Sequence, residues 1–244
     1  MEDPFIFPPD FRVIVIGGAG DIGSAIAQLF VARGARVTAT GHDRPALERS
    51  PLGSVTGADL AVVDVTSDEE VHEFASRFDK VDALINCAGI LVRDEEFQIE
   101  TFQRVLDVNL TGTFRTCTAF RPHLAASRGS IVNIASMNAF AALPRLPAYC
   151  ASKGGVVMLT KALALAWAEE GIRVNAVAPG YIETAINSEG RKDTAHRDRI
   201  SARTALKRWG QPDEVAGAVV FLTMPVSRYA TGTVYAVDGG FLAG

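Results

Sequence analysis

Cysteine is scarce in this sequence, and its spacing argues against two common uses of the residue. The chain of 244 residues contains three cysteines, Cys87, Cys117 and Cys150, an odd number without the short paired spacings of a metal site or a disulfide framework. A reducing compartment is the simplest setting for such a chain. We therefore expect a cytoplasmic protein with free thiols and no structural metal.

Long apolar runs and basic clusters are missing as well. No apolar run approaches about 18 residues, the length that a membrane-spanning helix requires, and the acidic start Met1-Glu2-Asp3-Pro4 lacks the charged segment of a signal peptide. Lys and Arg number 24 against 28 Asp and Glu, a formal net charge of −4, without a cluster typical of nucleic-acid binding. We expect neither a membrane nor a nucleic acid as a partner.

What the sequence does contain is a regular alternation of predicted strands and helices. Its hydrophobic content of 48% is enough for one large domain over residues 1–244. Short apolar or β-branched runs of the kind that form buried strands lie at residues 11–16, 36–40, 60–63, 81–85, 130–134, 173–177 and 233–237. The alternation predicts a doubly wound α/β fold with a seven-stranded, mostly parallel sheet and helices on both faces.

A glycine-rich turn joins the first predicted strand to the first predicted helix. Gly18-x-Gly20-x-x-Gly23 follows the strand, and apolar residues then recur at helical spacing from Ile22 to Phe30. Glycines in this place let the backbone approach a pyrophosphate, and the start of the helix supplies free N–H donors. The turn therefore predicts a dinucleotide-binding Rossmann fold rather than merely a tight turn.

Tyr149 and Lys153 are the most informative pair of residues in the chain. Their four-residue separation places both side chains on one face of a helix. Tyrosine ordinarily loses its proton near pH 10, and a cation within about 4–6 Å favours the phenolate. Lys153 is therefore expected to lower the pKa of Tyr149 and suit it to general acid–base catalysis. For this pair alone, the alternative is a helix with one Tyr and one solvated Lys.

Further motifs, in order along the chain, resemble those of a single family. Asn86-Cys87-Ala88-Gly89 is similar to the family's N-N-A-G turn with one substitution, and Asn109 matches its helix asparagine. Ser136 precedes Tyr149 by the expected thirteen residues, and residues 179–184 resemble its P-G-x-I-x-T segment. With the glycine turn and the Tyr/Lys pair, these motifs cover nearly the whole chain. They resemble the short-chain dehydrogenases/reductases of the single-domain type, similar to 3-oxoacyl reductases.

The resemblance implies an enzyme that interconverts a secondary alcohol and a ketone by hydride transfer with NAD(P). Tyr149 would exchange a proton with the reacting oxygen, and Ser136 would hydrogen-bond the same oxygen. Lys153 would bind the cofactor ribose and pass the proton on through a water held by Asn109. Taken alone, Ser136 also suits a strand-end cap, and Asn109 a satisfied buried amide. The implied cofactor contacts are Gly17, Gly20, Asp21, Ile22, Gly23, Asp43, Asp64, Val65, Asn86, Ala88, Gly89, Tyr149, Lys153, Pro179, Gly180, Ile182 and Thr184.

Two positions depart from the family's usual glycine turn, T-G-x-x-x-G-I-G. Ile16 replaces the Thr, and Asp21 stands at the middle glycine. The spacing of the glycines then matches the turn of the extended subfamily of epimerases and dehydratases. Extended members carry a sizeable C-terminal domain, whereas only residues 181–244 follow Gly180 here, which favours the short type. We interpret Asp21 as a carboxylate that is favourable at the start of a helix.

Charge near the expected ribose site bears on the choice between NAD and NADP. NADP-using members commonly place Arg or Lys before the middle glycine or just after the second strand, where this chain has Gly20 and Gly41-His42. The nearest acid after that strand is Asp43. Asp21 and Asp43 would both repel a phosphate, whereas Arg44 would attract one. The balance favours NAD, with NADP as the alternative.

The substrate is the least readable part of the prediction. The resemblance places Met137, Asn138 and Arg145 beside it, with a lid at about residues 185–205. A 3-oxoacyl thioester and a sugar derivative both stay open as the substrate class. A catalytically silent nucleotide-sensing module is the alternative function. Such a module would be expected to lack one of the four catalytic residues, and all four are present.

The helix predicted to begin near Tyr149 bears on assembly. Its apolar residues spread round more of the helix than one stripe, so two sides of it need a buried contact. In the family that the chain resembles, this helix and the preceding long one, here at about 97–126, pair across two-fold axes. We therefore expect a homotetramer or homodimer, with residues 241–244 contributing to a second interface.

Overall fold

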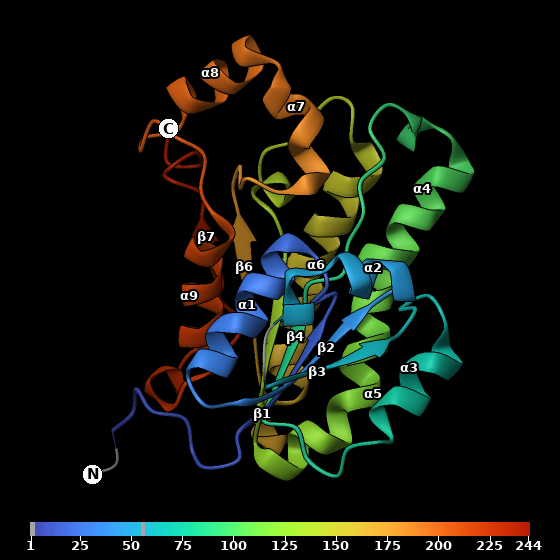
Figure 1. The fold of residues 1–244 in the computed structure, drawn as a ribbon, viewed down its shortest axis with the longest axis vertical. Coiled ribbons are helices and arrows are strands. Elements are labelled where there is room, and N and C mark those ends of the chain that lie inside the picture. The colour runs from blue at the N-terminus through green and yellow to red at the C-terminus, as the bar shows by residue number, and fades with distance from the viewer. Residues whose placement is uncertain (1–2, 55–56) are drawn as a thin grey trace.

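The protein folds around one seven-stranded sheet, seen in Figure 1. The computed structural model describes residues 3–54 and 57–244. The strand order is β3-β2-β1-β4-β5-β6-β7, and each neighbouring pair is parallel. The strands are β1 (Arg12–Ile16), β2 (Arg36–Gly41), β3 (Ala58–Val62), β4 (Ala83–Asn86), β5 (Ser130–Ile134), β6 (Arg173–Pro179) and β7 (Val234–Val237). The strand order reverses between β1 and β4, which is where ligands bind in doubly wound sheets.

Helices cover both faces of the sheet. The α-helices are α1 (Asp21–Ala32), α2 (Arg44–Arg49), α3 (Asp68–Ala75), α4 (Ile99–Leu106), α5 (Gly112–Ser127), α6 (Pro147–Ala166), α7 (Ser188–Lys192), α8 (Thr194–Arg203) and α9 (Pro212–Thr223). Short 3₁₀ turns are η1 (Pro51–Ser54), η2 (Glu95–Phe97), η4 (Met137–Ala139), η5 (Ala168–Glu170), η6 (Ala185–Asn187) and η7 (Pro225–Ser227). A π-helical turn, η3 (Asp107–Thr111), joins α4 to α5.

The side chains of each strand point alternately to the two faces of the sheet, and this explains why helices pack on both faces. In β1, Val13 and Val15 pack on one side with residues of α1 and α9, whereas Ile14 and Ile16 pack on the other side with residues of α3, α5 and α6. All four side chains are buried. Successive side chains of a strand point to opposite faces, so a strand that is buried on both faces reads as a continuous apolar run. The predicted fold class is confirmed by this arrangement.

Some predicted boundaries differ from the structure. The strand expected at 60–63 is Ala58–Val62, an edge strand in which Asp59, Leu60 and Val62 are exposed, so the apolar run marks only part of it. The long helix expected at about 97–126 is divided into α4, η3 and α5. A π-turn leaves no periodic signature, because it inserts a single residue into an otherwise helical pattern.

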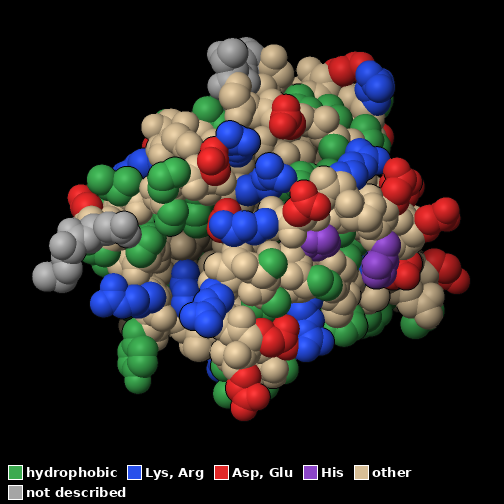
Figure 2. Space-filling view, turned by 90° about the horizontal axis from the view of Figure 1, so that it is seen from below, with side chains coloured by type: hydrophobic (Ala, Val, Ile, Leu, Met, Phe, Trp, Pro, Cys, Tyr) green, Lys and Arg blue, Asp and Glu red, His purple; other side chains and the backbone are tan. Residues whose placement is uncertain are grey.

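The two ends of the molecule differ in character. At the end where the strands finish, α7 and α8 stand above the sheet, as the upper part of Figure 1 shows. Figure 2 shows the opposite face, where Lys and Arg side chains alternate with Asp and Glu and neither sign forms a continuous patch. Within residues 3–54 and 57–244, no helix combines the length and the apolar character needed to cross a bilayer.

Candidate functional site

A cavity of about 350 Å³ lies at the carboxyl ends of the strands, and we call it the central cavity. Segments far apart in the sequence surround it: the turn after β1, the turn after β4, the end of β5, the start of α6 and the segment after β6. Many predicted site residues line it together: Gly17, Gly20, Asp21, Ile22, Gly23, Gly89, Ser136, Tyr149, Lys153, Pro179, Gly180, Ile182 and Thr184.

The glycine turn is shaped by backbone packing. Gly17 has a φ of +74°, and a Cβ there would lie 2.5 Å from the backbone nitrogen of Ala88. A Cβ on Gly23 would lie 2.3 Å from the carbonyl oxygen of Gly17. Helix α1 begins directly after Gly20, and no side chain caps it. The turn therefore presents a close backbone approach and uncapped N–H groups, which fit the pyrophosphate of a dinucleotide.

Tyr149 occupies the first turn of α6. The phenol interacts with the hydroxyl of Ser136, which also accepts a hydrogen bond from the Asn138 amide at 3.1 Å and so caps η4. Ser136 thus serves both as a strand-end cap and as a neighbour of Tyr149. Burial raises the pKa of Tyr149, and the contact with Ser136 lowers it by less.

Lys153 lies one turn further along the same helix. Its side chain is buried, and its Nζ donates a hydrogen bond to the carbonyl oxygen of Ile134 at 2.7 Å. Nζ is 5.7 Å from the centre of the Tyr149 ring. Burial lowers the pKa of Lys153 to about 8, and the nearby Cys87 opposes this shift. The predicted juxtaposition of Tyr149 and Lys153 is confirmed.

The electrostatic part of that prediction is wrong for this arrangement. We expected the charge of Lys153 to lower the pKa of Tyr149, whereas burial dominates and raises it. The same burial disfavours the ammonium form of Lys153, which weakens the expected cation. Sequence spacing shows that two groups meet, but it does not show how far the surrounding protein removes both from water.

The buried lysine makes stability depend on pH in a defined direction. Below pH 8, Lys153 is protonated in the folded and unfolded chains, and the cost of burying its charge is fully present. Above pH 8 the folded chain releases this proton before the unfolded chain does, so its stability rises with pH by up to about 3 kcal/mol. We compare the free energy of unfolding in urea of the unchanged protein with that of Lys153→Met at pH 7 to 10. As the pH rises, the free energy of unfolding of the unchanged protein should increase relative to that of the variant. Lys161→Met, on the exposed side of α6, should show no such trend.

Asn109 lies in the π-turn η3 and is fully engaged by the protein. Its Oδ1 accepts from the amide of Ile90 at 2.8 Å, and its Nδ2 donates to the Ile90 carbonyl at 2.9 Å and to the Ser152 hydroxyl at 3.0 Å. The side chain therefore fixes the turn after β4 against α6. Because both protons of its side-chain amide are engaged, Asn109 could hold a water only through an oxygen, and its backbone carbonyl already accepts from the Thr113 hydroxyl.

Some predicted cofactor residues do not reach the central cavity. Asn86 points into the layer beneath it, where its amide bonds to Asn133 and accepts from Thr116. Asp43 caps α2 by accepting from the Ala46 amide at 2.7 Å. The other predicted cofactor residues that are absent from the lining are Asp64, Val65 and Ala88, and the predicted catalytic residue Asn109 is absent as well. Asp64 binds the amide and hydroxyl of Thr66, and Val65 is buried against Gly112.

The segment expected to form a lid carries η6, α7 and α8, and it is tied to the glycine turn. Asp21 lies in the first turn of α1, and its Oδ2 accepts a hydrogen bond from the Ala185 amide at 2.6 Å. Thr184, Ala185, Ile186 and Asn187 line the central cavity. Asp21 therefore has a structural partner that its place in the sequence did not suggest.

Two of the three residues expected beside the substrate line the cavity. Met137 and Asn138 do so, whereas Arg145 is absent from the lining and forms an ion pair with Asp94. Sequence reasoning missed other residues that line the cavity, among them Leu91, Arg93 and Tyr181. Arg93 lies four residues after Gly89, and Tyr181 lies within residues 179–184, so nearness to motifs that the resemblance had located could have identified both.

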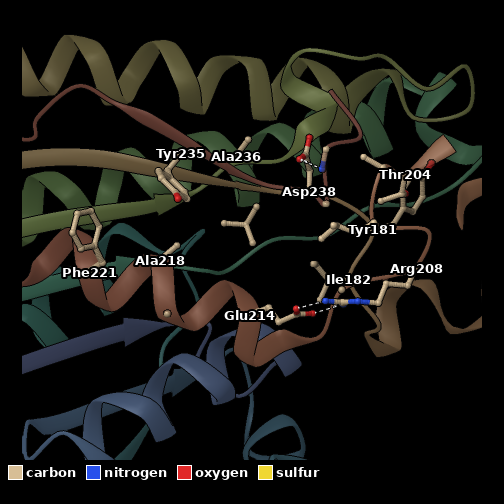
Figure 3. A pocket seen from close by; sticks show the side chains of 17 residues that line it. Tyr181, Ile182, Thr204, Arg208, Glu214, Ala218, Phe221, Tyr235, Ala236 and Asp238 are labelled. Carbon is tan, nitrogen blue, oxygen red and sulfur yellow. Dashed lines mark hydrogen bonds and ion pairs between the residues drawn. The ribbon is translucent and has the colours of Figure 1, made fainter. Parts of the chain in front are cut away.

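A second, larger cavity of about 660 Å³ lies elsewhere on the molecule, between α9, β7 and the segment after α8. Figure 3 shows its lining, with Phe221 and Tyr235 at one end and the ion-paired Arg208 and Glu214 at the other. None of Ser136, Tyr149 and Lys153 lines it. Although this cavity is the larger of the two, it is therefore not the candidate active site.

Known proteins resemble this chain over almost its whole length. A family model described as enoyl-(acyl carrier protein) reductase matches residues 17–242. The 2-dehydro-3-deoxy-D-gluconate 5-dehydrogenase of Bacillus subtilis is 38% identical over 94% of both chains. The galactitol 2-dehydrogenase of Cereibacter sphaeroides is 36% identical over 99% of both.

The solved structures agree with these sequence relatives. That of a gluconate 5-dehydrogenase from Burkholderia cenocepacia, in complex with NADP and tartrate, has a TM-score of 0.91 and 34% identity, covering 99% of this chain and 98% of its own. Fold, glycine turn, Tyr/Lys pair and relatives lead to one conclusion. The chain belongs to the short-chain dehydrogenase/reductase family and is an NAD(P)-dependent oxidoreductase that interconverts secondary alcohols and ketones.

Proposed function

We propose that the protein oxidises a secondary hydroxyl of a polyhydroxylated acid and reduces the matching ketone, with Tyr149 as the general acid–base. The observation that carries this proposal is that Ser136, Tyr149 and Lys153 line the same cavity as the glycine turn. A dinucleotide bound there supplies or accepts the hydride. The glycine turn and residues 179–184 would hold it.

Each polar side chain then has a separate task. Tyr149 takes the proton from the alcohol during oxidation and returns it to the ketone oxygen during reduction. Ser136 donates a hydrogen bond to that oxygen as negative charge develops on it. Lys153, whose Nζ is held by the Ile134 carbonyl, binds the ribose. Asn109 keeps the turn after β4 in register with α6.

The lining of the cavity favours a polar, anionic substrate. Arg93 lines it and makes no hydrogen bond or ion pair with any residue in the described part of the chain, so its guanidinium is available to a carboxylate. Asn138 also lines it, and its buried Oδ1 has no hydrogen-bond partner among the described residues. A substrate hydroxyl would satisfy that oxygen. The relatives named for gluconate derivatives support this class over a 3-oxoacyl thioester, and the relative named for galactitol supports a polyhydroxylated substrate.

Hydride transfer followed at 340 nm tests the proposal. The purified protein is assayed with NAD or NADP and three groups of compounds: aldonates, neutral polyols and 3-oxoacyl thioesters in the reductive direction. We expect the aldonates to give the highest kcat/KM. Preference for the thioesters would contradict the substrate class, and no turnover with any of these or with other alcohols and ketones would favour a nucleotide-sensing module.

We infer a preference for NAD over NADP from the carboxylates near the expected ribose and phosphate positions. Asp43 lies two residues after Gly41, the last residue of β2, and its side chain is 46% exposed. NADH should therefore bind more tightly than NADPH, and Asp43→Asn should narrow the ratio, because Asn keeps an oxygen that caps α2 but removes the charge. Titration by nucleotide fluorescence measures both affinities. Tighter binding of NADPH by the unchanged protein would show that Arg44 or His42 dominates.

We also propose a homotetramer built from two apolar surfaces. The first lies on α4, α5 and α6, where Ile99, Phe114, Met158 and Leu165 are exposed, Leu165 by 84%. The second lies at the edge strand β7 and α9, beside the cavity in Figure 3, where Phe221 and Tyr235 are exposed. Exposed apolar patches of this kind mark association surfaces.

Light scattering coupled to size exclusion measures the assembly. A tetramer of the 26.0 kDa chain is expected at micromolar concentration. Leu165→Glu should reduce it to a smaller species, because a charge would be buried in the first surface. Glu48→Lys, at an exposed position of α2, which belongs to neither surface, should leave the assembly unchanged. A stable, active monomer of the unchanged protein would contradict the proposal.

Two further features complete the proposal. Residues 1–244 act as a single domain, with about 185–205 as a lid over the central cavity, because residues 184–187 line that cavity and α7 and α8 stand above it. The cysteine pattern supports a cytoplasmic location, since all three cysteines are free.

A further inference from the structure

Glu96 is a buried acid whose role the predicted mechanism does not explain. It lies in η2, on the segment between β4 and α4, and is 1% exposed. No salt bridge joins it to a Lys or Arg in the described part of the chain. A buried carboxylate is costly unless hydrogen bonds satisfy it, so its partners identify what it does.

Both oxygens of Glu96 accept hydrogen bonds from the backbone. Oε2 accepts from the Tyr149 amide at 2.9 Å, and Oε1 accepts from the Val92 amide at 3.0 Å. Tyr149 is the third residue of α6, and amides in a first helical turn have no acceptor within the helix. Leu146, at the N-cap, provides no side-chain cap. Glu96 therefore caps the helix from 53 residues away in the sequence.

A second contact holds the same segment in place. Asp94 forms an ion pair with Arg145, and its amide donates to the Arg145 carbonyl at 3.3 Å. The segment from Val92 to Glu96 is thus fastened to the loop before α6 and to the first turn of α6 itself. The Asp94–Arg145 pair is exposed and contributes little by itself, so the buried Glu96 is the stronger constraint.

We infer that Glu96 is a positioning residue for the reaction: it fixes the first turn of α6 and thereby sets where the Tyr149 phenol lies relative to Ser136. This inference rests on the proposed role of Tyr149. The predicted mechanism needs the phenol, the hydroxyl and the reacting oxygen to meet, and Glu96 holds the backbone amide of the residue that carries the phenol. A displacement of this turn would move Tyr149, whereas Lys153, one turn further on, stays held by the Ile134 carbonyl.

The charge of Glu96 also acts on the phenol. The pKa of Tyr149 is raised mainly by burial, and the negative charge of Glu96 raises it further. The groups that face the phenol are Ser136, which lowers the pKa, Cys150, Cys87 and Glu96, which raise it, and Lys153 at 5.7 Å from the ring centre. Removal of the Glu96 charge should lower the pKa of Tyr149. Since oxidation needs the phenolate, the acid limb of the kcat profile should move to lower pH.

The test compares Glu96→Gln with a matched cap elsewhere. The glutamine side chain accepts through one oxygen only, so one backbone N–H loses its partner. We expect kcat for alcohol oxidation to fall about 10- to 100-fold, the scale of a small misplacement of a reacting group, with the acid limb shifted to lower pH and NADH affinity unchanged. Glu214→Gln neutralises a comparable capping carboxylate at the start of α9, where Glu214 accepts from the Gln211 amide at 2.8 Å and forms an ion pair with Arg208. It should lower the melting temperature and leave both the profile and kcat unchanged.

Glu96→Asp keeps the charge but shortens the side chain by one methylene. It should lower kcat, while the acid limb of the pH profile stays near that of the unchanged protein. If Glu96→Gln does not fold, this variant tests the positioning role of Glu96. Wild-type kcat and pH profile in either variant, with Tyr149→Phe inactive, would overturn the role of Glu96. Near-normal turnover of Tyr149→Phe would instead overturn the proposed function on which this inference rests.

Discussion

Replacing Tyr149 with Phe is expected to lower kcat by about 10²–10⁴-fold, the contribution of one well-placed acid–base group. The substitution removes only the hydroxyl, and the ring keeps its place on α6. The hydroxyl of Ser136, which interacts with the phenol in the central cavity, is too weak an acid to take over the proton transfer. Affinity for NADH should stay nearly unchanged, because Lys153 and the glycine turn are untouched. Steady-state kinetics and nucleotide fluorescence measure the two quantities.

Tyr181→Phe is the matched control for this prediction. Tyr181 lines the same cavity, and burial raises its pKa as it does for Tyr149. Its hydroxyl has no place in the proposed proton transfer, so kcat should change by a few-fold at most. If Tyr149→Phe kept near-normal turnover, or if Tyr181→Phe lost as much, the assignment of the acid to Tyr149 would be wrong.

Gly23→Ala is expected to have the second-largest effect, on both stability and cofactor binding. The added Cβ would meet the Gly17 carbonyl oxygen at 2.3 Å and the Gly18 Cα at 2.8 Å. Both are backbone atoms, so the turn must open. Overpacking costs about 1–3 kcal/mol, or roughly 2–4 °C in melting temperature for each kcal/mol in a chain of this size. Because the same turn presents the N–H groups for the pyrophosphate, NADH affinity should fall as well.

Gly20→Ala separates this clash from a general effect of losing a glycine. The nearest atom to a Cβ on Gly20 is 3.6 Å away, and its φ of −76° suits any residue. The melting temperature of Gly20→Ala should therefore stay close to that of the unchanged protein. Thermal unfolding of both variants checks the prediction, and equal losses of melting temperature in the two would contradict it.

The fold could be predicted well because its signals are local. The strand at 130–134 has the predicted bounds, since every one of its residues is buried. The edge strand β3 was placed less accurately, because exposed residues interrupt its apolar run. The division of the helix at η3 could not be predicted, since Asp107 to Thr111 carry no proline or glycine to mark it.

The candidate site could be predicted where it depends on spacing and motif. Tyr149 and Lys153 meet because four residues make about one helical turn. The direction of the Tyr149 pKa could not be predicted, because burial is a property of the whole packed cavity. Glu96 was missed for a similar reason: its partner, the amide of Tyr149, lies far away in the sequence, and a backbone amide has no sequence signature.

The hydrogen bond between Asp21 and Ala185 has a consequence for measurement. It joins the cofactor-side turn to the first residue of η6 across 164 positions of sequence. An amide that donates to a carboxylate exchanges its hydrogen slowly only while that contact is closed. The exchange rate of the Ala185 amide in deuterated solvent should therefore report how often the segment over the cavity separates from the turn. The exchange rate of this one backbone proton therefore measures how often the site opens.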